Sequence, residues 1–151
     1  MEFNQFIHPE LTIYKDAPDL NKKKVLEIIS KLTREWDSNV KYQDVLEALQ
    51  KRERIGNTAI GHGIAIPHAR IRGLTQPLCV IVSLDSSINF AAKDTALVDL
   101  IFGLLVPEKK AEQHVAILAS LAEKLQNKSY CDKLRHAQND KELYRAVLSF
   151  A

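Results

Sequence analysis

The sequence is poor in cysteine and has no long hydrophobic run. Its 151 residues include two cysteines, Cys79 and Cys131, and neither belongs to a Cys-x-x-Cys pair. This pattern favours two unpaired thiols in a reducing compartment over a disulfide framework. The longest apolar stretch, around residues 96–107, contains Asp99 and is too short to span a bilayer. The N-terminus lacks a charged segment followed by an apolar one, so we expect no signal peptide and a cytoplasmic location.

Neither sign of charge is in large excess. The chain has 21 basic and 19 acidic side chains and a formal net charge of +2. So small an imbalance gives no argument for nucleic acid or a membrane surface, and we expect neither as a partner. Internal repeats, low-complexity segments and Gly/Ser/Pro linkers are also missing, while 46% of the residues are hydrophobic. We therefore predict a single domain over residues 1–151, with enough apolar material for a core.

Motifs for common cofactors and metals are missing too. In the Gly61–Gly63 segment the third glycine of a dinucleotide fingerprint is replaced by Ile66, and no Gly-Lys-Ser/Thr occurs. The chain has no His-Glu-x-x-His sequence. Three imidazoles suffice for a catalytic zinc, so a site built from His62, His68 and His114 stays open as an alternative. Otherwise we expect no cofactor and no metal.

Hydrophobic spacing predicts two helices in the first third of the chain. Residues 22–36 and 42–54 carry apolar side chains at helical spacing. Asp19 or Asn21 is a plausible N-cap of the first helix, and Gly56 is a natural end for the second.

The middle of the chain has sequence patterns that are typical of β-strands. Residues 58–68 alternate isoleucines with small residues and are interrupted by glycines, which predicts a strand broken by bends. Residues 78–84 and 97–106 are apolar, β-branched and bounded by prolines, as buried strands are. A shorter strand is expected near residues 88–90.

The C-terminal third returns to helical spacing. The residues expected on one buried helix face are Val115, Leu118, Leu121, Ala122 and Leu125. Short helices near 130–136 and 140–149 close the chain. The order of helix, helix, strands, helix and helix predicts one sheet sandwiched by helices.

Among the five histidines, His68 is the strongest candidate for chemistry. His8 and His136 lie in polar surroundings, and we interpret them as surface residues. Pro67 fixes the chain direction just before His68, and such stiff positioning suits a nucleophile or a ligand. The simpler interpretation is that Pro67-His68 is merely a strand end. That interpretation must also explain why residues 58–69 carry almost no charge.

Several segments resemble one protein family in order and spacing. Gly61-His-Gly-Ile-Ala-Ile-Pro-His68-Ala-Arg70 is similar to the active-site segment of the enzyme IIA domains of the bacterial phosphoenolpyruvate-dependent phosphotransferase system, of the fructose/mannitol/nitrogen-regulatory type. Further matching segments are Lys51-Arg52-Glu53, Val98–Pro107, Gln113-His114-Val115 and Glu142-Leu143-Tyr144. The resemblance covers about residues 10 to 148. It implies an α/β fold: a single three-layer domain with a central mixed β sheet flanked by helices on both faces.

The resemblance also implies roles for three side chains. His68 would accept a phosphoryl group from an HPr-like phosphocarrier protein, and a neutral imidazole is a competent nucleophile near pH 7. Arg52 and His114 would stabilise the phosphoryl group. From the residues alone, Arg52 is equally an exposed helix-end arginine, and His114 a partly buried helix residue satisfied by the backbone.

Two positions depart from the family pattern. His62 stands where the family often has Asn or Glu, and we assign it no role beyond that of a possible pH-sensitive donor. Ala69 stands where Gly is common and would restrict the backbone after His68. Arg70 could belong to a docking surface or simply be exposed.

Three functions fit this pattern. The first is a nitrogen-regulatory phosphotransferase component that controls target proteins by its phosphorylation state. The second is a fructose/mannitol-type component that passes phosphate to a IIB domain. The third is an interaction module that is never phosphorylated. The absence of a transmembrane run and the residues of the His68 segment favour the nitrogen-regulatory component.

Overall fold

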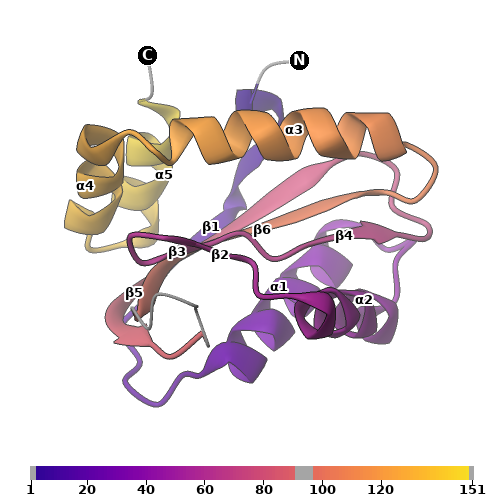
Figure 1. Ribbon diagram of the computed structural model, residues 1–151, viewed down its shortest axis with the longest axis horizontal. Coiled ribbons are helices and arrows are strands. Elements are labelled where there is room, and N and C mark those ends of the chain that lie inside the picture. The colour runs from indigo at the N-terminus through magenta and orange to yellow at the C-terminus, as the bar shows by residue number, and fades with distance from the viewer. Residues whose placement is uncertain (1–2, 91–96, 150–151) are drawn as a thin grey trace.

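The chain folds into three layers with a mixed β sheet in the middle (Figure 1). The computed structural model describes residues 3–90 and 97–149. In sheet order, the strands are β1 (Ile7–Lys15), β5 (Leu78–Ile88), β6 (Val98–Pro107), β3 (Ile64–Ala65) and β2 (Ala59–Gly61), and β4 (His68–Ile71) also pairs with β6. Parallel pairs (β1–β5, β3–β6, β4–β6) and antiparallel pairs (β5–β6, β2–β3) coexist. The predicted three-layer α/β fold with a mixed sheet is confirmed.

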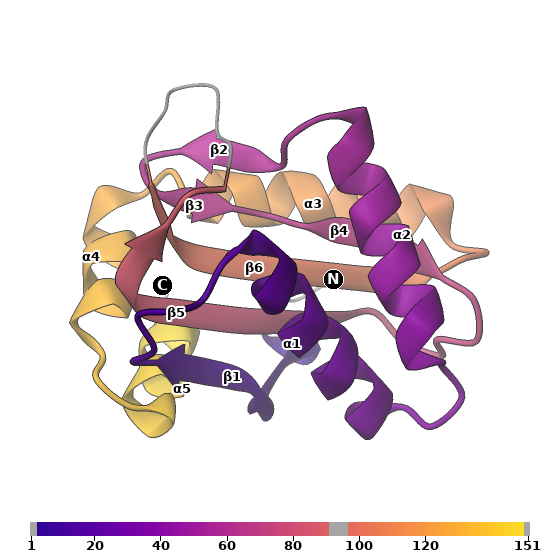
Figure 2. The ribbon, with the colours of Figure 1, turned by 90° about the horizontal axis from the view of Figure 1, so that it is seen from below.

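Two helices cover one face of the sheet. Figure 2 shows α1 (Lys22–Trp36) and α2 (Tyr42–Ile55) on the near face, with α3 (Ala111–Lys124) behind. The side chain of Asn21 caps α1 by accepting a hydrogen bond from the Lys24 amide at 2.8 Å, so Asn21 and not Asp19 is the N-cap. The second helix ends at the predicted Gly56. Apolar residues of both helices pack on the sheet and bury one half of the core.

Three helices cover the other face: α3 (Ala111–Lys124), α4 (Lys128–His136) and α5 (Asp140–Leu148) (Figure 1). The short 3-10 helix η1 (Phe3–Phe6) packs beside α3. The second half of the core includes Ile117, Leu121 and Leu125. Val115 was expected on this buried face, but it is 69% exposed. The buried stripe of the helix runs through Ile117, two positions further along.

The two central strands are buried on both faces, as continuous apolar runs predict. The shorter strand expected near residues 88–90 is not separate. Strand β5 continues to Ile88, with a register irregularity between Ser83 and Ile88, and Phe90 lies beyond it. In the part of the chain that the structure describes, no helix is long and apolar enough to cross a membrane.

Strand β1 is an element that the sequence pattern did not predict. It contains Pro9 and is the edge strand of the sheet, where a residue without an amide hydrogen is tolerated. Its register against β5 breaks between Ile7 and Thr12, so its apolar residues do not alternate regularly. Helix α5 packs on the strand, and the Tyr14 amide donates a hydrogen bond to Asp140.

Candidate functional site

His68 is the first residue of β4 and lies beside the central strand β6. It is half-buried and is in register with Leu104, whose amide donates a hydrogen bond to the carbonyl of Pro67 at 2.8 Å. The Nδ1 atom of His68 lies 2.8 Å from the carbonyl oxygen of Ile66. Because a carbonyl only accepts, Nδ1 carries the proton in this contact. The lone pair of the neutral ring is therefore on Nε2.

Arg52 reaches this lone pair from the last turn of α2. Its Nε donates to His68 Nε2 at 3.2 Å, and its Nη1 donates to the Gly56 carbonyl at 2.8 Å. The first contact requires Nε2 to be an acceptor, which agrees with the proton on Nδ1. The second contact holds the guanidinium against the end of its own helix. The structure thus brings Arg52 and His68 together, as the resemblance implied.

His114 approaches the same histidine from the first turns of α3. The two imidazole rings meet edge to face, with centroids 5.2 Å apart and an interplanar angle of 70°. His114 Nε2 is buried and has no hydrogen-bond partner among the described residues. Buried polar atoms are rarely left unpaired, so this nitrogen keeps a hydrogen-bonding capacity that no described residue uses.

The two histidines open into a groove of cationic character, with a cavity volume of about 410 Å³. Lys51, Arg52 and Arg70 line the groove, and none of its lining residues is a carboxylate. Burial lowers the pKa of His68, and the neighbouring Arg52 lowers it further. The pKa of His114 is also lowered, first by burial and then by the proximity of His68, Arg70 and Arg52. The site therefore pairs neutral imidazoles with fixed positive charges, an arrangement that favours an anion.

The lowered pKa values predict the pH range of the neutral site. A histidine whose pKa is lowered stays neutral at every pH above its ordinary value of about 6.5 and takes up a proton only below it. His68 and His114 should therefore titrate with midpoints below about 6.5 when their ring protons are followed by NMR. A midpoint above that value for His68 would show that burial and Arg52 do not dominate its surroundings.

Glu53 supports the site in a way that sequence reasoning missed. This buried carboxylate pairs with Lys22 at 2.9 Å and accepts hydrogen bonds from both the amide and the hydroxyl of Thr58. It thereby ties the loop after α2, which includes Gly56, to the helix that carries Arg52. The only sequence signal was its place next to Arg52, because Lys22 and Thr58 meet it only in the folded chain.

His62 does not join the two histidines of the groove. It is exposed on the turn between β2 and β3, with a left-handed φ of 56°, and lines a separate cavity. The trio required for the zinc alternative is therefore not assembled. Among the described residues, no group of three or more His, Cys, Asp or Glu side chains could hold a metal.

The remaining singled-out residues occupy ordinary positions. Ala69 lies in β4 and is not among the described residues with positive φ, so its backbone does not need the glycine of the family pattern. Arg70 is exposed at the groove. His136 is exposed as expected, whereas His8 is only partly exposed and stacks on Trp36 with ring centroids 4.2 Å apart.

A mixed-sheet domain with this histidine site matches one known family over nearly its whole length. Residues 5–149 match the family described as phosphoenolpyruvate-dependent sugar phosphotransferase system, EIIA 2, and the chain belongs to it. The implied family membership is thus confirmed.

Two relatives of the chain are nitrogen regulatory proteins, and a third is a mannitol IIA protein with the same fold. It is 43% identical over 128 residues to the nitrogen regulatory protein of Escherichia coli (strain K12), covering 84% of this chain and 78% of that protein. The crystal structure of nitrogen regulatory protein IIA-Ntr from Neisseria meningitidis superposes with a TM-score of 0.83 at 33% identity, covering 95% of this chain and 97% of that one. The crystal structure of IIA mannitol from Escherichia coli shares the fold, with a TM-score of 0.74 at 18% identity, covering 93% of this chain and 98% of that one.

Proposed function

We propose that this protein is a phosphoryl carrier that accepts a phosphoryl group on Nε2 of His68. The observation that carries the proposal is the pair of opposed contacts on the ring: Nδ1 bonded to the Ile66 carbonyl and Nε2 facing Arg52. In the transfer, the phosphorus–nitrogen bond of the donor breaks as the Nε2 lone pair forms a new one. The proton on Nδ1 stays in place, bonded to the carbonyl, so no separate base is needed.

The groove supplies what the transferred group needs. A phosphoryl group brings nearly two negative charges, which require nearby donors. The Nε of Arg52, which faces the lone pair in the free protein, would donate to a phosphoryl oxygen once Nε2 is occupied. His114 Nε2 would carry a proton and donate from the other side. Lys51 and Arg70 add positive charge at the opening.

The role of His114 leads to a testable prediction. His114→Ala should still accept one phosphoryl group, but the adduct should hydrolyse at least roughly tenfold faster, because a hydrogen bond to a charged group is worth about 1.5–3 kcal/mol. The lifetime of the phosphohistidine can be followed by ³¹P NMR. His136→Ala, which removes an exposed histidine outside the groove, is the matched control and should leave the lifetime unchanged. Equal phosphohistidine lifetimes in the native chain, His114→Ala and His136→Ala would show that His114 does not stabilise the phosphoryl group.

We further propose that the donor is an HPr-like phosphocarrier and that the protein regulates target proteins by its phosphorylation state. Support comes from the two nitrogen regulatory relatives, at 43% and 33% identity. A cytoplasmic location fits the free, buried thiols of Cys79 and Cys131. In the sugar-transport alternative the same histidine would pass its phosphoryl group to a IIB domain.

The test is to incubate the purified protein with phosphoenolpyruvate, enzyme I and HPr-like carriers and to measure its intact mass. We expect one added phosphoryl group that is lost in acid, with NMR placing the phosphorus on Nε2. No added mass with any carrier would favour the unphosphorylated interaction module. Rapid onward transfer to a sugar-specific IIB domain would favour the sugar-transport role.

A further inference from the structure

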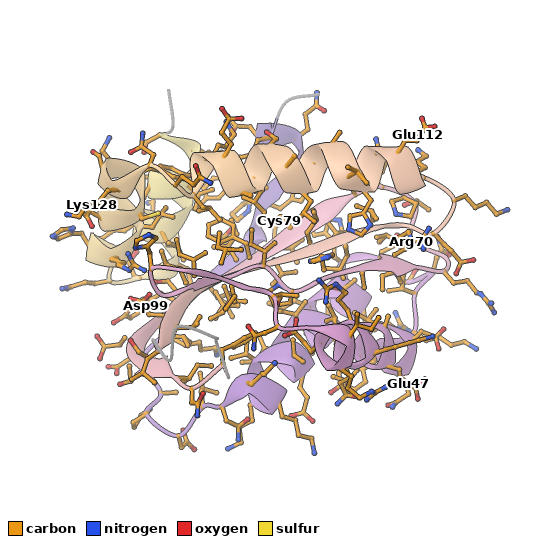
Figure 3. All side chains as sticks on the ribbon, viewed as in Figure 1. Glu47, Arg70, Cys79, Asp99, Glu112 and Lys128 are labelled. Carbon is orange, nitrogen blue, oxygen red and sulfur yellow. The ribbon has the colours of Figure 1, made fainter. Side chains whose placement is uncertain are left out.

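A second cavity, of about 290 Å³, lies where the β2–β3 turn meets α4 and the end of α3. We call it the turn cavity. Figure 3 places Lys128, which lines it, at one end of the molecule and Arg70, which lines the His68 groove, at the other. The two cavities have no lining residue in common. The phosphoryl chemistry proposed for His68 therefore gives this cavity no role.

The wall of the turn cavity is held in place by a network of hydrogen bonds. The Nε and Nη2 atoms of Arg135 donate to the Asp99 carboxylate at 2.9–3.1 Å, and Nη2 also donates to the His62 carbonyl at 2.6 Å. A side chain at Gly63 would come within 2.9 Å of Arg135 and 3.0 Å of Asp99. Gly63 thus allows the turn to lie close against α4, and both Gly61 and Gly63 have a positive φ that glycine adopts without strain. Neither reason involves the His68 site.

The cavity has an apolar floor and a rim with charges of both signs. Ile64, Leu125 and Cys131 are buried and form the floor. On the rim, Lys128 and Asp132 form an ion pair at 3.6 Å, with side chains 90% and 48% exposed. Such an exposed pair contributes little to stability, so both groups can turn to a ligand at small cost.

Arg135 also lines the cavity and has a guanidinium nitrogen, Nη1, that donates to none of the described residues. All hydrogen bonds of Arg135 to described residues come from Nε and Nη2, which leaves Nη1 available as a donor. A ligand with only a negative charge would be repelled by Asp132, and a ligand with only a positive charge would be repelled by Lys128. A zwitterion satisfies both. The cavity volume lies close to the lower end of the range for small-molecule pockets, which begins at about 300 Å³, so the ligand must be small.

We propose that the turn cavity binds a free α-amino acid with an apolar side chain. Its carboxylate lies between Lys128 and Arg135 Nη1, its ammonium group faces Asp132, and its side chain rests on Ile64 and Leu125. This site is independent of the proposed phosphoryl transfer.

The test uses L-leucine as the probe and the ¹⁵N-labelled full chain. Titration should shift the amide signals of Ile64, Leu125 and Arg135 in a saturable way, with a dissociation constant of about 1 mM or tighter, and leave the signal of Arg70 unchanged. Two analogues separate the charges. Both 3-methylbutylamine, which lacks the carboxylate, and 4-methylpentanoate, which lacks the ammonium group, should bind at least roughly tenfold more weakly.

Variants on the rim of α4 complete the test. Lys128→Gln and Asp132→Asn should each weaken L-leucine binding roughly tenfold, while Lys133→Gln, an exposed change on the same helix outside the cavity, should not. If L-leucine gives no saturable shift, or if either analogue binds as tightly as L-leucine, the proposal is wrong. Neither result bears on His68, whose phosphorylation is read separately by mass.

Discussion

A His68→Ala protein should gain no phosphoryl group under conditions that fully load the native chain. The substitution removes the Nε2 lone pair, and His114 does not replace it because in the proposed site its Nε2 carries a proton and has no lone pair to offer. The expected loss is complete within the detection limit of intact-mass measurement. The fold should survive, because only two hydrogen bonds are lost: the one to Ile66 is worth about 1 kcal/mol and the one from the charged Arg52 about 1.5–3 kcal/mol.

Matched controls make this result specific. His62→Ala and His136→Ala remove exposed histidines that do not line the groove, and both proteins should still load fully. Circular dichroism of the His68→Ala protein should show the helix content of the native chain and a cooperative thermal transition. An acid-labile adduct on the His68→Ala protein would move the acceptor to another residue and overturn the proposal.

An Arg52→Ala protein should accept the phosphoryl group about 100-fold more slowly, the effect of removing one preorganised donor to a developing charge. Arg52→Lys should recover only part of the rate. An ammonium group cannot donate in fixed directions to both the Gly56 carbonyl and the group on His68, as the guanidinium does. Rapid-quench measurement of the phosphorylated fraction gives the rates.

A second readout separates this effect from structural damage. The positive charge of Arg52 is one cause of the lowered pKa of His68, so its removal should raise that pKa. The NMR titration of the His68 ring should move upward in Arg52→Ala and stay in place in Arg54→Ala, an exposed neighbour outside the groove. A slow Arg52→Ala protein with an unchanged His68 titration would point to a disturbed loop instead of a lost donor.

The sequence singled out His68 more clearly than the side chains that surround it. His68 stands out because Pro67 and the uncharged segment before it are local signals. The contacts of His68 with Arg52 and His114 join three separate elements, and without the family resemblance no local pattern would have paired them. Glu53 was missed for the same reason, since its partners Lys22 and Thr58 lie on other segments.

For the fold as well, some elements could be predicted from the sequence and others could not. The central strands and the first two helices were predictable because burial on both faces, or on one helical stripe, leaves a clear pattern of apolar residues. Strand β1 was missed because Pro9 and a register break hide its pattern, and only pairing with β5 defines it. Val115 fits the helical period but is exposed, because spacing predicts a stripe and not which side chain at its margin meets the sheet.

The stacking of His8 on Trp36 gives the protein a built-in optical reporter. Trp36 is the only tryptophan of the chain, so its emission reports where β1 meets the end of α1, and neither His8 nor Trp36 lines the His68 groove. Burial lowers the pKa of His8, and protonation of a ring stacked on an indole quenches the indole. Acidification should therefore dim the fluorescence with a midpoint below about 6.5, equally in loaded and unloaded protein. Docking of the edge strand could thus be followed by fluorescence without any label.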